Sequence, residues 1–231
     1  MKITKKAKLI GEFLQKHNKA QYSIRDAIDL LKKLPQPKFN ASVDVSVRLN
    51  IDPAKTTQNV RGFAQLPHGV GKTVRVAVFA QGAEYDIAKL TQADVVISSQ
   101  DEGKDFMENP NVDYCIATPG MMPIMAKWGL SKVLGPKGLM PNAKMGTLTT
   151  DIKSAVHNLK LGQAMFKNDK TGFLHTTIGR MSFSTEQLID NFKALIQTIE
   201  QNKPAEIKTN IINKVRVNFT MSPAFVVEHN V

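Results

Sequence analysis

The sequence has little sulfur chemistry and no long apolar segment. Only one of its 231 residues is cysteine, Cys115, so no disulfide can form within the chain. A single thiol also argues against most zinc sites and indicates a protein kept in a reducing compartment. No run of 18 apolar residues occurs, and the apolar stretch that follows Lys8 is only Leu9 and Ile10. We therefore expect neither a membrane span nor the core of a signal peptide.

Acidic residues are also in deficit. Asp and Glu total 20 against 31 Lys and Arg, which gives a net charge of +11 and a pI near 9.7. The excess is uneven, with net charges of +8 over residues 1–68, +1 over 69–161 and +2 over 162–231. This surplus predicts an acidic partner, such as a nucleic acid. If the two ends pack together, they form a domain of net charge +10 that carries a nearly neutral insert.

The hydropathy pattern differs between the ends and the middle of the chain. From Ser42 to Asn50 apolar and polar residues alternate, which predicts a strand with one polar face. In the middle, short continuous apolar runs alternate with helical patterns, which is typical of a parallel sheet covered on both faces. The expected strands are 42–50, 75–80, 94–98, 113–117, two strands within 162–180 joined by a turn at 168–172, and 214–220. The expected helices are 4–17, 24–34 with Ser23 and Asp26 as a capping box, 83–92, 102–108, 151–161 and 185–201.

Residues 129–147 carry four Gly and two Pro. This composition predicts a long ordered loop without a regular element, in which methionines near 121–145 fill gaps against the sheet. The pattern as a whole predicts a mixed α+β and α/β protein of two domains. One domain comprises residues 1–67 and 162–231, and the other is an insert over 68–161.

No catalytic constellation emerges from the sequence. The segment HGVGKT (68–73) ends like a phosphate-binding loop, but Leu66 stands where the pattern needs Gly, and a strand rather than a helix follows. The five histidines show no metal-ligand spacing, and Cys115 lies in an apolar strand, where burial raises the thiol pKa. We expect no metal, no cofactor, no small-molecule substrate and no enzymatic activity.

Three short clusters have the chemistry of RNA contacts. Lys38, Phe39 and Asn40 place an ammonium, an aromatic ring and an amide together before the strand that begins at Ser42, and we expect them at a sheet edge. The turn from Asn168 to Gly172 is a second cluster, although a bulged hairpin turn explains it equally well. The end of the last strand, Thr220-Met221-Ser222, is small and polar enough for close approach to a phosphate or ribose.

Four strings carry a family resemblance: GPKGLMPNAKMGT (135–147), QNVRG (58–62), LPHGVGK (66–72) and KNDKTG (167–172). In order, spacing and total length they resemble the bacterial-type ribosomal protein L-one family of the large subunit, over about residues 23–223. The resemblance implies a discontinuous split β-α-β domain and an inserted Rossmann-like three-layer domain.

The resemblance also implies a function and partners. The family binds large-subunit ribosomal RNA at the base of a mobile stalk and assists release of deacylated transfer RNA from the exit site. Bacterial members also repress translation by binding their own operon messenger RNA. The expected protein is therefore a cytoplasmic component of the large ribosomal subunit, a monomer on the ribosome, without a membrane partner.

Residue roles follow from the same resemblance. Ser222 departs from the glycine usual in the family, and Ala143 departs from the usual proline, which puts one backbone contact and the rigidity of one loop in question. The implied RNA-binding residues are Lys38, Phe39, Ser42, Asn168, Asp169, Lys170, Thr171, Thr220, Met221 and Ser222. Further candidates for contacts with RNA or tRNA are Lys55, Arg61, Lys137 and Lys144. The expected hinge residues are His68, Gly69, Leu161 and Gly162.

Two alternatives remain open. The Rossmann-like insert could carry a nucleotide-dependent enzyme, since that topology hosts many of them. The basic domain could instead act as a general RNA chaperone without a preferred site. Tight binding of ATP would favour the first alternative, and equal competition by unrelated RNA would favour the second.

Overall fold

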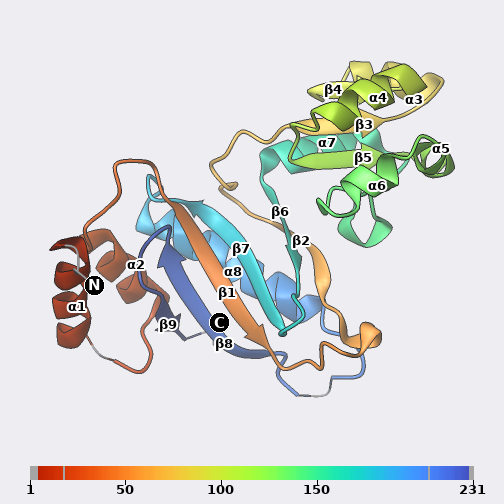
Figure 1. Ribbon diagram of the computed structural model, residues 1–231. Coiled ribbons are helices and arrows are strands. Elements are labelled where there is room, and N and C mark those ends of the chain that lie inside the picture. Colours follow the sequence, from red (N-terminus) through yellow and green to blue (C-terminus); the bar gives the residue numbers. More distant parts are fainter. Residues whose placement is uncertain (1–4, 18, 208, 229–231) are drawn as a thin grey trace. The chain divides into compact units, whose positions relative to one another are not determined.

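The computed structural model describes residues 5–17, 19–207 and 209–228, which divide into two compact units (Figure 1). The first unit comprises residues 1–71 and 164–231, and the second comprises 72–163. The expected boundaries at 67/68 and 161/162 therefore lie a few residues before those of the compact units. Among the described residues, no helix combines the length and hydrophobicity that crossing a bilayer requires.

The first unit is built on a four-stranded sheet with the order β7-β1-β8-β9. β1 is an interior strand, antiparallel to both β7 and β8. The alternation seen in the sequence is confirmed, because Val43, Val45 and Val47 are fully buried. The strands are β1 (Ser42–Leu49), β7 (Phe173–Arg180), β8 (Ile212–Phe219) and β9 (Phe225–Val227), with β2 (Arg61–Gln65) and β6 (Gln163–Lys167) paired in a separate ribbon.

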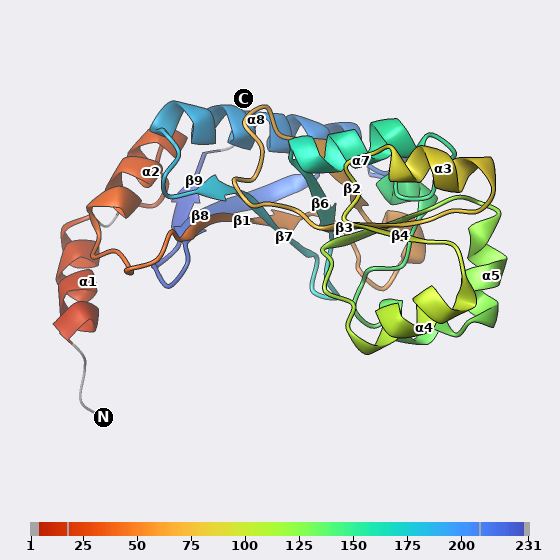
Figure 2. The same cartoon turned by 90° about the horizontal axis from the view of Figure 1, so that it is seen from above.

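One face of this sheet is covered by α2 and α8, as Figure 2 shows. α8 is fixed at its start by a reciprocal capping box between Ser184 and Gln187, and its apolar stripe enters the core. At Ser23 only one half of the expected capping box forms, since the Ser23 side chain accepts from the Asp26 N–H. The helices are α1 (Lys5–Lys16), α2 (Ile24–Lys33), the short η1 (Thr56–Gln58) and α8 (Thr185–Gln201); Thr4, included in the expected first helix, lies outside the described residues.

The second unit has a parallel sheet of order β4-β3-β5, with α3 and α7 on one side and α4 on the other (Figure 2). All four residues of β3 are buried, as expected of a strand covered on both faces. The fold class, α+β with an inserted α/β unit, is thus confirmed. The elements are β3 (Val76–Phe79), α3 (Ala83–Lys89), β4 (Val95–Ile97), α4 (Gln100–Glu108), β5 (Tyr114–Ala117), α5 (Met121–Lys127), α6 (Leu130–Leu134), η2 (Ala143–Met145) and α7 (Ile152–Leu161).

Three expectations about local structure were wrong or incomplete. Residues 129–147 contain a helix, α6, because Leu130 and Leu134 are both fully buried and Gly129 takes the left-handed conformation that starts the turn. Met121 and Met125 are buried on a helix, α5, rather than in a loop. The two strands expected on either side of 168–172 are present as β6 and β7, but they belong to different sheets, and an isolated antiparallel bridge between Asn168 and Leu174 joins them at the turn.

Candidate nucleic-acid interface

The start of β1 presents an exposed cation and an exposed ring. Two prolines end α2, and Lys38 and Phe39 follow in an irregular segment before Ser42. The Phe39 side chain is 49% exposed, so its ring is free for stacking rather than part of the core. Because β1 is interior to the sheet, these residues lie at the end of a strand and not at a lateral edge, which corrects the expected placement.

The end of β8 lies directly beside the start of β1. The backbone N–H of Ser42 donates to the Thr220 hydroxyl at 3.1 Å, and the Thr220 N–H donates to the Ser42 carbonyl at 3.1 Å. Arg180, at the end of β7, donates to the Ser42 hydroxyl at 3.3 Å and to the Asn40 carbonyl at 3.2 Å. Two of the three predicted clusters are therefore one surface.

The turn after Thr220 is held by the residue that departs from the family pattern. The Ser222 hydroxyl accepts from the Phe219 N–H at 2.8 Å and donates to the Pro223 carbonyl at 3.0 Å. Met221 takes φ 65°, and its side chain is 73% exposed. A side chain at 222 thus closes the turn from within, while Met221 is the residue that projects from it.

The third predicted cluster lies at the opposite end of β1. Phe173, the first residue of β7, pairs with Arg48, and the Leu49 N–H donates to the Gly172 carbonyl at 3.0 Å. With a rise of about 3.3 Å per residue, the eight residues of β1 separate the two ends by roughly 25 Å. The structure therefore does not gather the 168–172 turn with the other two clusters.

Within that turn, the side chains of two predicted contact residues are hydrogen-bonded to other groups of the protein. Asn168 is 8% exposed, and its amide accepts from the Val60 N–H at 2.9 Å and donates to the Asn59 side chain at 3.2 Å. The Asp169 carboxylate accepts from the Thr171 hydroxyl and from the N–H groups of Thr171 and Phe173. These bonds, the Thr171 hydroxyl first, hold the pKa of Asp169 below its usual range. Lys170 and Thr171 form the exposed tip.

Replacing Asp169 by alanine should loosen this tip. We expect RNA affinity to fall by about tenfold, roughly 1.4 kcal/mol, with no decrease in its salt dependence, because the lost bonds shape the turn and do not touch phosphate. Since the pKa is lowered in the folded state, the ordering of the turn should be present above the usual carboxyl pKa and be lost as the pH falls through the lowered value. Filter binding over a salt series measures the first effect, with Asp101→Ala as the control. A clear decrease in the salt slope would contradict this role.

Between the two ends runs the open face of the sheet, which sequence reasoning largely missed. Arg48 lies opposite Lys214, and Ser46 lies opposite Arg216. These side chains and Phe173 line a hollow of about 80 Å³. The residues whose side chains share this face are Ser42, Asp44, Ser46, Arg48, Phe173, His175, Thr177, Lys214, Arg216 and Asn218.

Aromatic and cationic groups interleave on this face. The Arg48 guanidinium lies 6.0 Å from the Phe173 ring centroid, and the rings of Phe173 and His175 stack at 6.1 Å with an interplanar angle of 12°. Asp44 is a carboxylate on the same face, and it accepts from the Thr177 hydroxyl at 2.6 Å. The alternation of Lys214, Arg216 and Asn218 along β8 was the signal that could have revealed this surface. It links the predicted clusters along the open face of the sheet, with the cationic and aromatic side chains gathered toward the 168–172 end.

The four further candidates divide between the units. Lys55 is exposed, on the loop in which Pro53 would lie 3.5 Å from a Cβ at Gly172, and Arg61 is half-buried at the start of β2. Lys137 is exposed in the second unit; the backbone of Lys144 lies in η2, and its side chain is outside the described part of the chain. Lys55 and Arg61 are thus close to the 168–172 turn, whereas Lys137 is on the insert.

The expected hinge residues lie within the two units rather than between them. The His68 N–H donates to the Asn191 side chain at 3.0 Å, and the Asn191 amide donates to the carbonyls of Gly69 at 2.9 Å and Ile178 at 2.7 Å. Asn191 is fully buried on α8, so it fixes this segment to the first unit. A Cβ at Gly71 would lie 2.9 Å from the Phe183 ring, which shows that the first unit holds the chain as far as residue 71.

The second unit begins at the next residue, Lys72, where contacts to that unit start. Lys72 forms an ion pair with Asp113, and the Arg75 N–H donates to the same carboxylate. Leu161 and Gly162 belong to the end of α7, where the Gly162 N–H donates to Leu159. We therefore move the proposed pivots to the Gly71–Lys72 and Gln163–Ala164 boundaries of the compact units.

The structure gives little support to the alternative that the insert is a nucleotide-dependent enzyme. Lys72, the lysine of the Gly-Lys-Thr string, is paired with Asp113 in a segment that leads into a strand. Cys115 is buried in β5, and burial raises the pKa of its thiol to about 12. Within the described part of the chain, no group of three or more metal-ligating residues is placed to hold an ion.

Comparison with known proteins gives a consistent result. The sequence model described as the ribosomal protein L1p/L10e family matches residues 31–223. The protein named large ribosomal subunit protein uL1 from Coxiella burnetii (strain Dugway 5J108-111) is 43% identical over 229 residues, covering 98% of this chain and 96% of the relative. Proteins of the same name from Shewanella piezotolerans and Histophilus somni are 42% and 44% identical, and each alignment covers 99% of this chain and 97% or 98% of the relative.

Proposed function

This chain belongs to the ribosomal protein L1 family, and on that premise we propose that it binds large-subunit ribosomal RNA at the mobile stalk through its first unit. Like the relatives named above, it is a structural component of the large ribosomal subunit in the cytoplasm. The proposal has three more specific parts. They concern the surface of the first unit that binds ribosomal RNA, the binding of exit-site transfer RNA, and the binding of the protein's own messenger RNA.

The observation that supports the anchoring surface is the open sheet face with its two ends. Lys38 and Phe39 lie at one end, Lys170 lies at the other, and Arg48 and Arg216 lie between them. Ammonium and guanidinium groups bind phosphate, and exposed rings stack on unpaired bases, which is the chemistry that RNA recognition requires. The charge distribution agrees, since residues 1–68 alone carry a net charge of +8.

A filter-binding titration of the full chain against stalk RNA tests this proposal, with unrelated RNA of equal length as competitor. We expect binding that survives moderate salt and resists the competitor. Equal competition would instead identify a general RNA chaperone and overturn the proposal.

Lys38→Ala and Lys170→Ala should each flatten the plot of log affinity against log salt by about 0.9 for a duplex contact, because each lysine neutralises one phosphate. At 0.1 M salt this corresponds to roughly an eightfold loss per variant. Lys193→Ala, on the exposed side of α8, serves as the matched control and should leave the slope unchanged. Weaker binding with an unaltered slope would mean that the lysine positions structure rather than contacting phosphate.

The transfer RNA and messenger RNA parts of the proposal are tested separately. Lys55, Arg61, Lys137 and Lys144 are the proposed tRNA contacts, and changing them to Ala should weaken tRNA binding by the assembled subunit without releasing the protein from stalk RNA. The proposed repression uses the same sheet face, so the leader of its own operon messenger should compete with stalk RNA for one site. Simultaneous binding of both RNAs would contradict a shared site.

We propose no chemical step for this protein. The remaining enzymatic alternative needs ATP or a dinucleotide to bind the insert. Isothermal titration of the full chain with ATP should show no saturable binding at micromolar concentrations, and tight binding would revive that alternative.

A further inference from the structure

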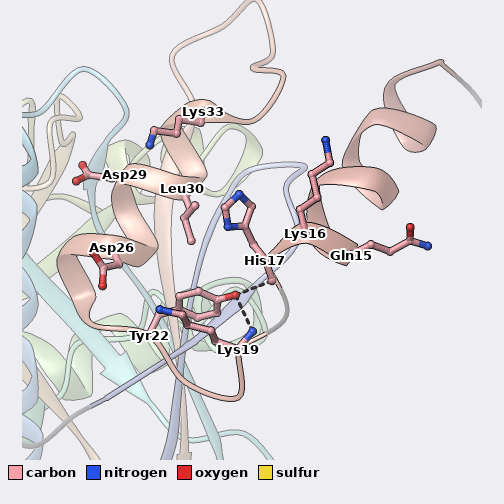
Figure 3. Close-up of a pocket in the computed structure, with 9 residues that line it drawn as sticks. All are labelled: Gln15, Lys16, His17, Lys19, Tyr22, Asp26, Asp29, Leu30 and Lys33. Atoms are coloured by element: carbon pink, nitrogen blue, oxygen red, sulfur yellow. Dashed lines mark hydrogen bonds between the residues drawn. The ribbon is translucent and has the colours of Figure 1, made fainter.

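A cavity of about 590 Å³ lies between the end of α1 and the side of α2 (Figure 3). α2 packs on the covered face of the sheet, opposite the open face. Its volume falls in the range of small-ligand sites, roughly 300–1,000 Å³. Figure 3 shows the His17 ring between the two helices, with Lys16 on the α1 side and Lys33 on the α2 side. The functional argument above leaves this cavity unused.

The wall of the cavity is tied to the core. The Tyr22 hydroxyl donates to the His17 carbonyl at 2.5 Å and accepts from the Lys19 N–H at 3.0 Å. The Tyr22 backbone pairs with the C-terminal strand through Val226 and Glu228, and its ring meets Phe225 edge to face at 5.2 Å. Tyr22 therefore links the backbones of His17 and Lys19 to the core of the first unit.

The lining divides into a ring-binding part and an anion-binding part. Leu30 and His17 supply apolar surface and a flat ring, and the His17 ring is itself supported by Phe13 at a centroid distance of 4.6 Å. Lys16, Lys19 and Lys33 supply three ammonium groups. Within the described part of the chain, none of the three has a carboxylate within ion-pair distance.

Two carboxylates complete the lining of the cavity and restrict the kinds of ligand that it can bind. Asp26 and Asp29 would repel a simple inorganic anion, and the three lysines would repel an amine. One carboxylate oxygen of Asp29 accepts from the Thr185 hydroxyl at 3.1 Å, so Asp29 is partly engaged by the protein, whereas among the described residues no side chain bonds the Asp26 carboxylate. A ligand that suits both signs has a phosphate, a flat ring and exocyclic N–H donors.

We propose that this cavity binds one unpaired nucleotide of the RNA held by the first unit. Its base lies against Leu30 and the His17 ring, and the two phosphates that flank it lie against Lys16 and Lys33, one phosphate to each lysine. Lys33 is five residues before Lys38, at most about 18 Å away along the chain, so a strand bound at the start of β1 can continue to the cavity. The inference rests on the proposed function only in taking RNA as the partner.

The test uses the full chain and a single-stranded RNA octamer of mixed sequence. In NMR spectra the octamer should shift the His17 and Tyr22 signals, whereas inorganic phosphate at the same concentration should not. The double variant Lys16→Gln/Lys33→Gln should bind the octamer about 25-fold more weakly at 0.1 M salt, with a salt slope reduced by about 1.4, as expected for two single-strand phosphate contacts. His17→Ala should weaken binding with the slope unchanged.

The control variant Lys193→Gln/Lys127→Gln removes the same charge from exposed sites elsewhere. Equal losses in the test and control variants would overturn the cavity proposal, as would equal shifts of His17 by inorganic phosphate. The two proposals fail in different ways. If Lys38→Ala weakens binding and the cavity variants do not, the sheet face binds RNA and the cavity does not. If the octamer signal persists at His17 while stalk RNA does not bind, the stalk-binding proposal fails and the cavity proposal stands.

Discussion

Replacing Asn191 by alanine is expected to destabilise the first unit by about 3 kcal/mol. The Asn191 side chain is fully buried and makes three hydrogen bonds to backbone groups, those of His68, Gly69 and Ile178. Truncation leaves these groups without partners in a buried site, and each costs about 1 kcal/mol or more. Urea unfolding followed by circular dichroism measures the loss, and Gln197→Ala, on the exposed side of α8, should change it by less than about 0.5 kcal/mol.

The same variant shows whether Asn191 only stabilises the core or also holds the segment 68–71, which leads to the second unit. The amide of His68 donates to Asn191, so its hydrogen exchange should accelerate in Asn191→Ala even under conditions where the rest of the first unit is protected. If the amide hydrogen exchange of His68 is unchanged while the free energy of unfolding falls, Asn191 stabilises the core but does not hold the segment 68–71. The pivot would then begin at His68 and not after Gly71.

The sequence predicted most elements because their patterns are local. Alternation in Ser42–Leu49 and continuous apolar runs such as Val76–Phe79 each report which faces a strand buries. α8 spans Thr185–Gln201, which is the range expected from the sequence. The short α6 was missed because its two buried leucines stand among glycines and prolines, and there tertiary burial outweighs composition.

The sequence predicted residues of the candidate site, but it did not predict how those residues are arranged in space. Lys38, Thr220 and Lys170 come from segments far apart in the sequence, and only the strand register shows that the first two meet while the third is a strand length away. The family resemblance predicts Asn168 as an RNA contact, and the structure adds that its buried side chain is turned toward Val60. A sequence pattern gives the residue type at a position, but the partner of a polar side chain depends on tertiary contacts.

The open sheet face should give the largest effect on RNA binding. Arg48, Lys214 and Arg216 lie side by side on β1 and β8, and within the described part of the chain none forms an ion pair. Changing all three to alanine should reduce the salt slope by up to about 2.7 and lower affinity for stalk RNA by roughly 10²- to 10³-fold at 0.1 M salt, if each neutralises one phosphate.

A matched triple variant decides whether this effect is local or reflects net charge alone. Lys104→Ala, Lys127→Ala and Lys132→Ala together remove the same three charges from exposed helical positions of the second unit. Long-range attraction would weaken similarly in both triple variants, whereas direct contact at the sheet affects only the first. Because β1 and β8 are covered on their other face, truncating outward side chains should leave their packing intact, and thermal unfolding of the two variants should agree within a few degrees. Equal losses of RNA affinity would exclude the sheet face as the anchoring surface.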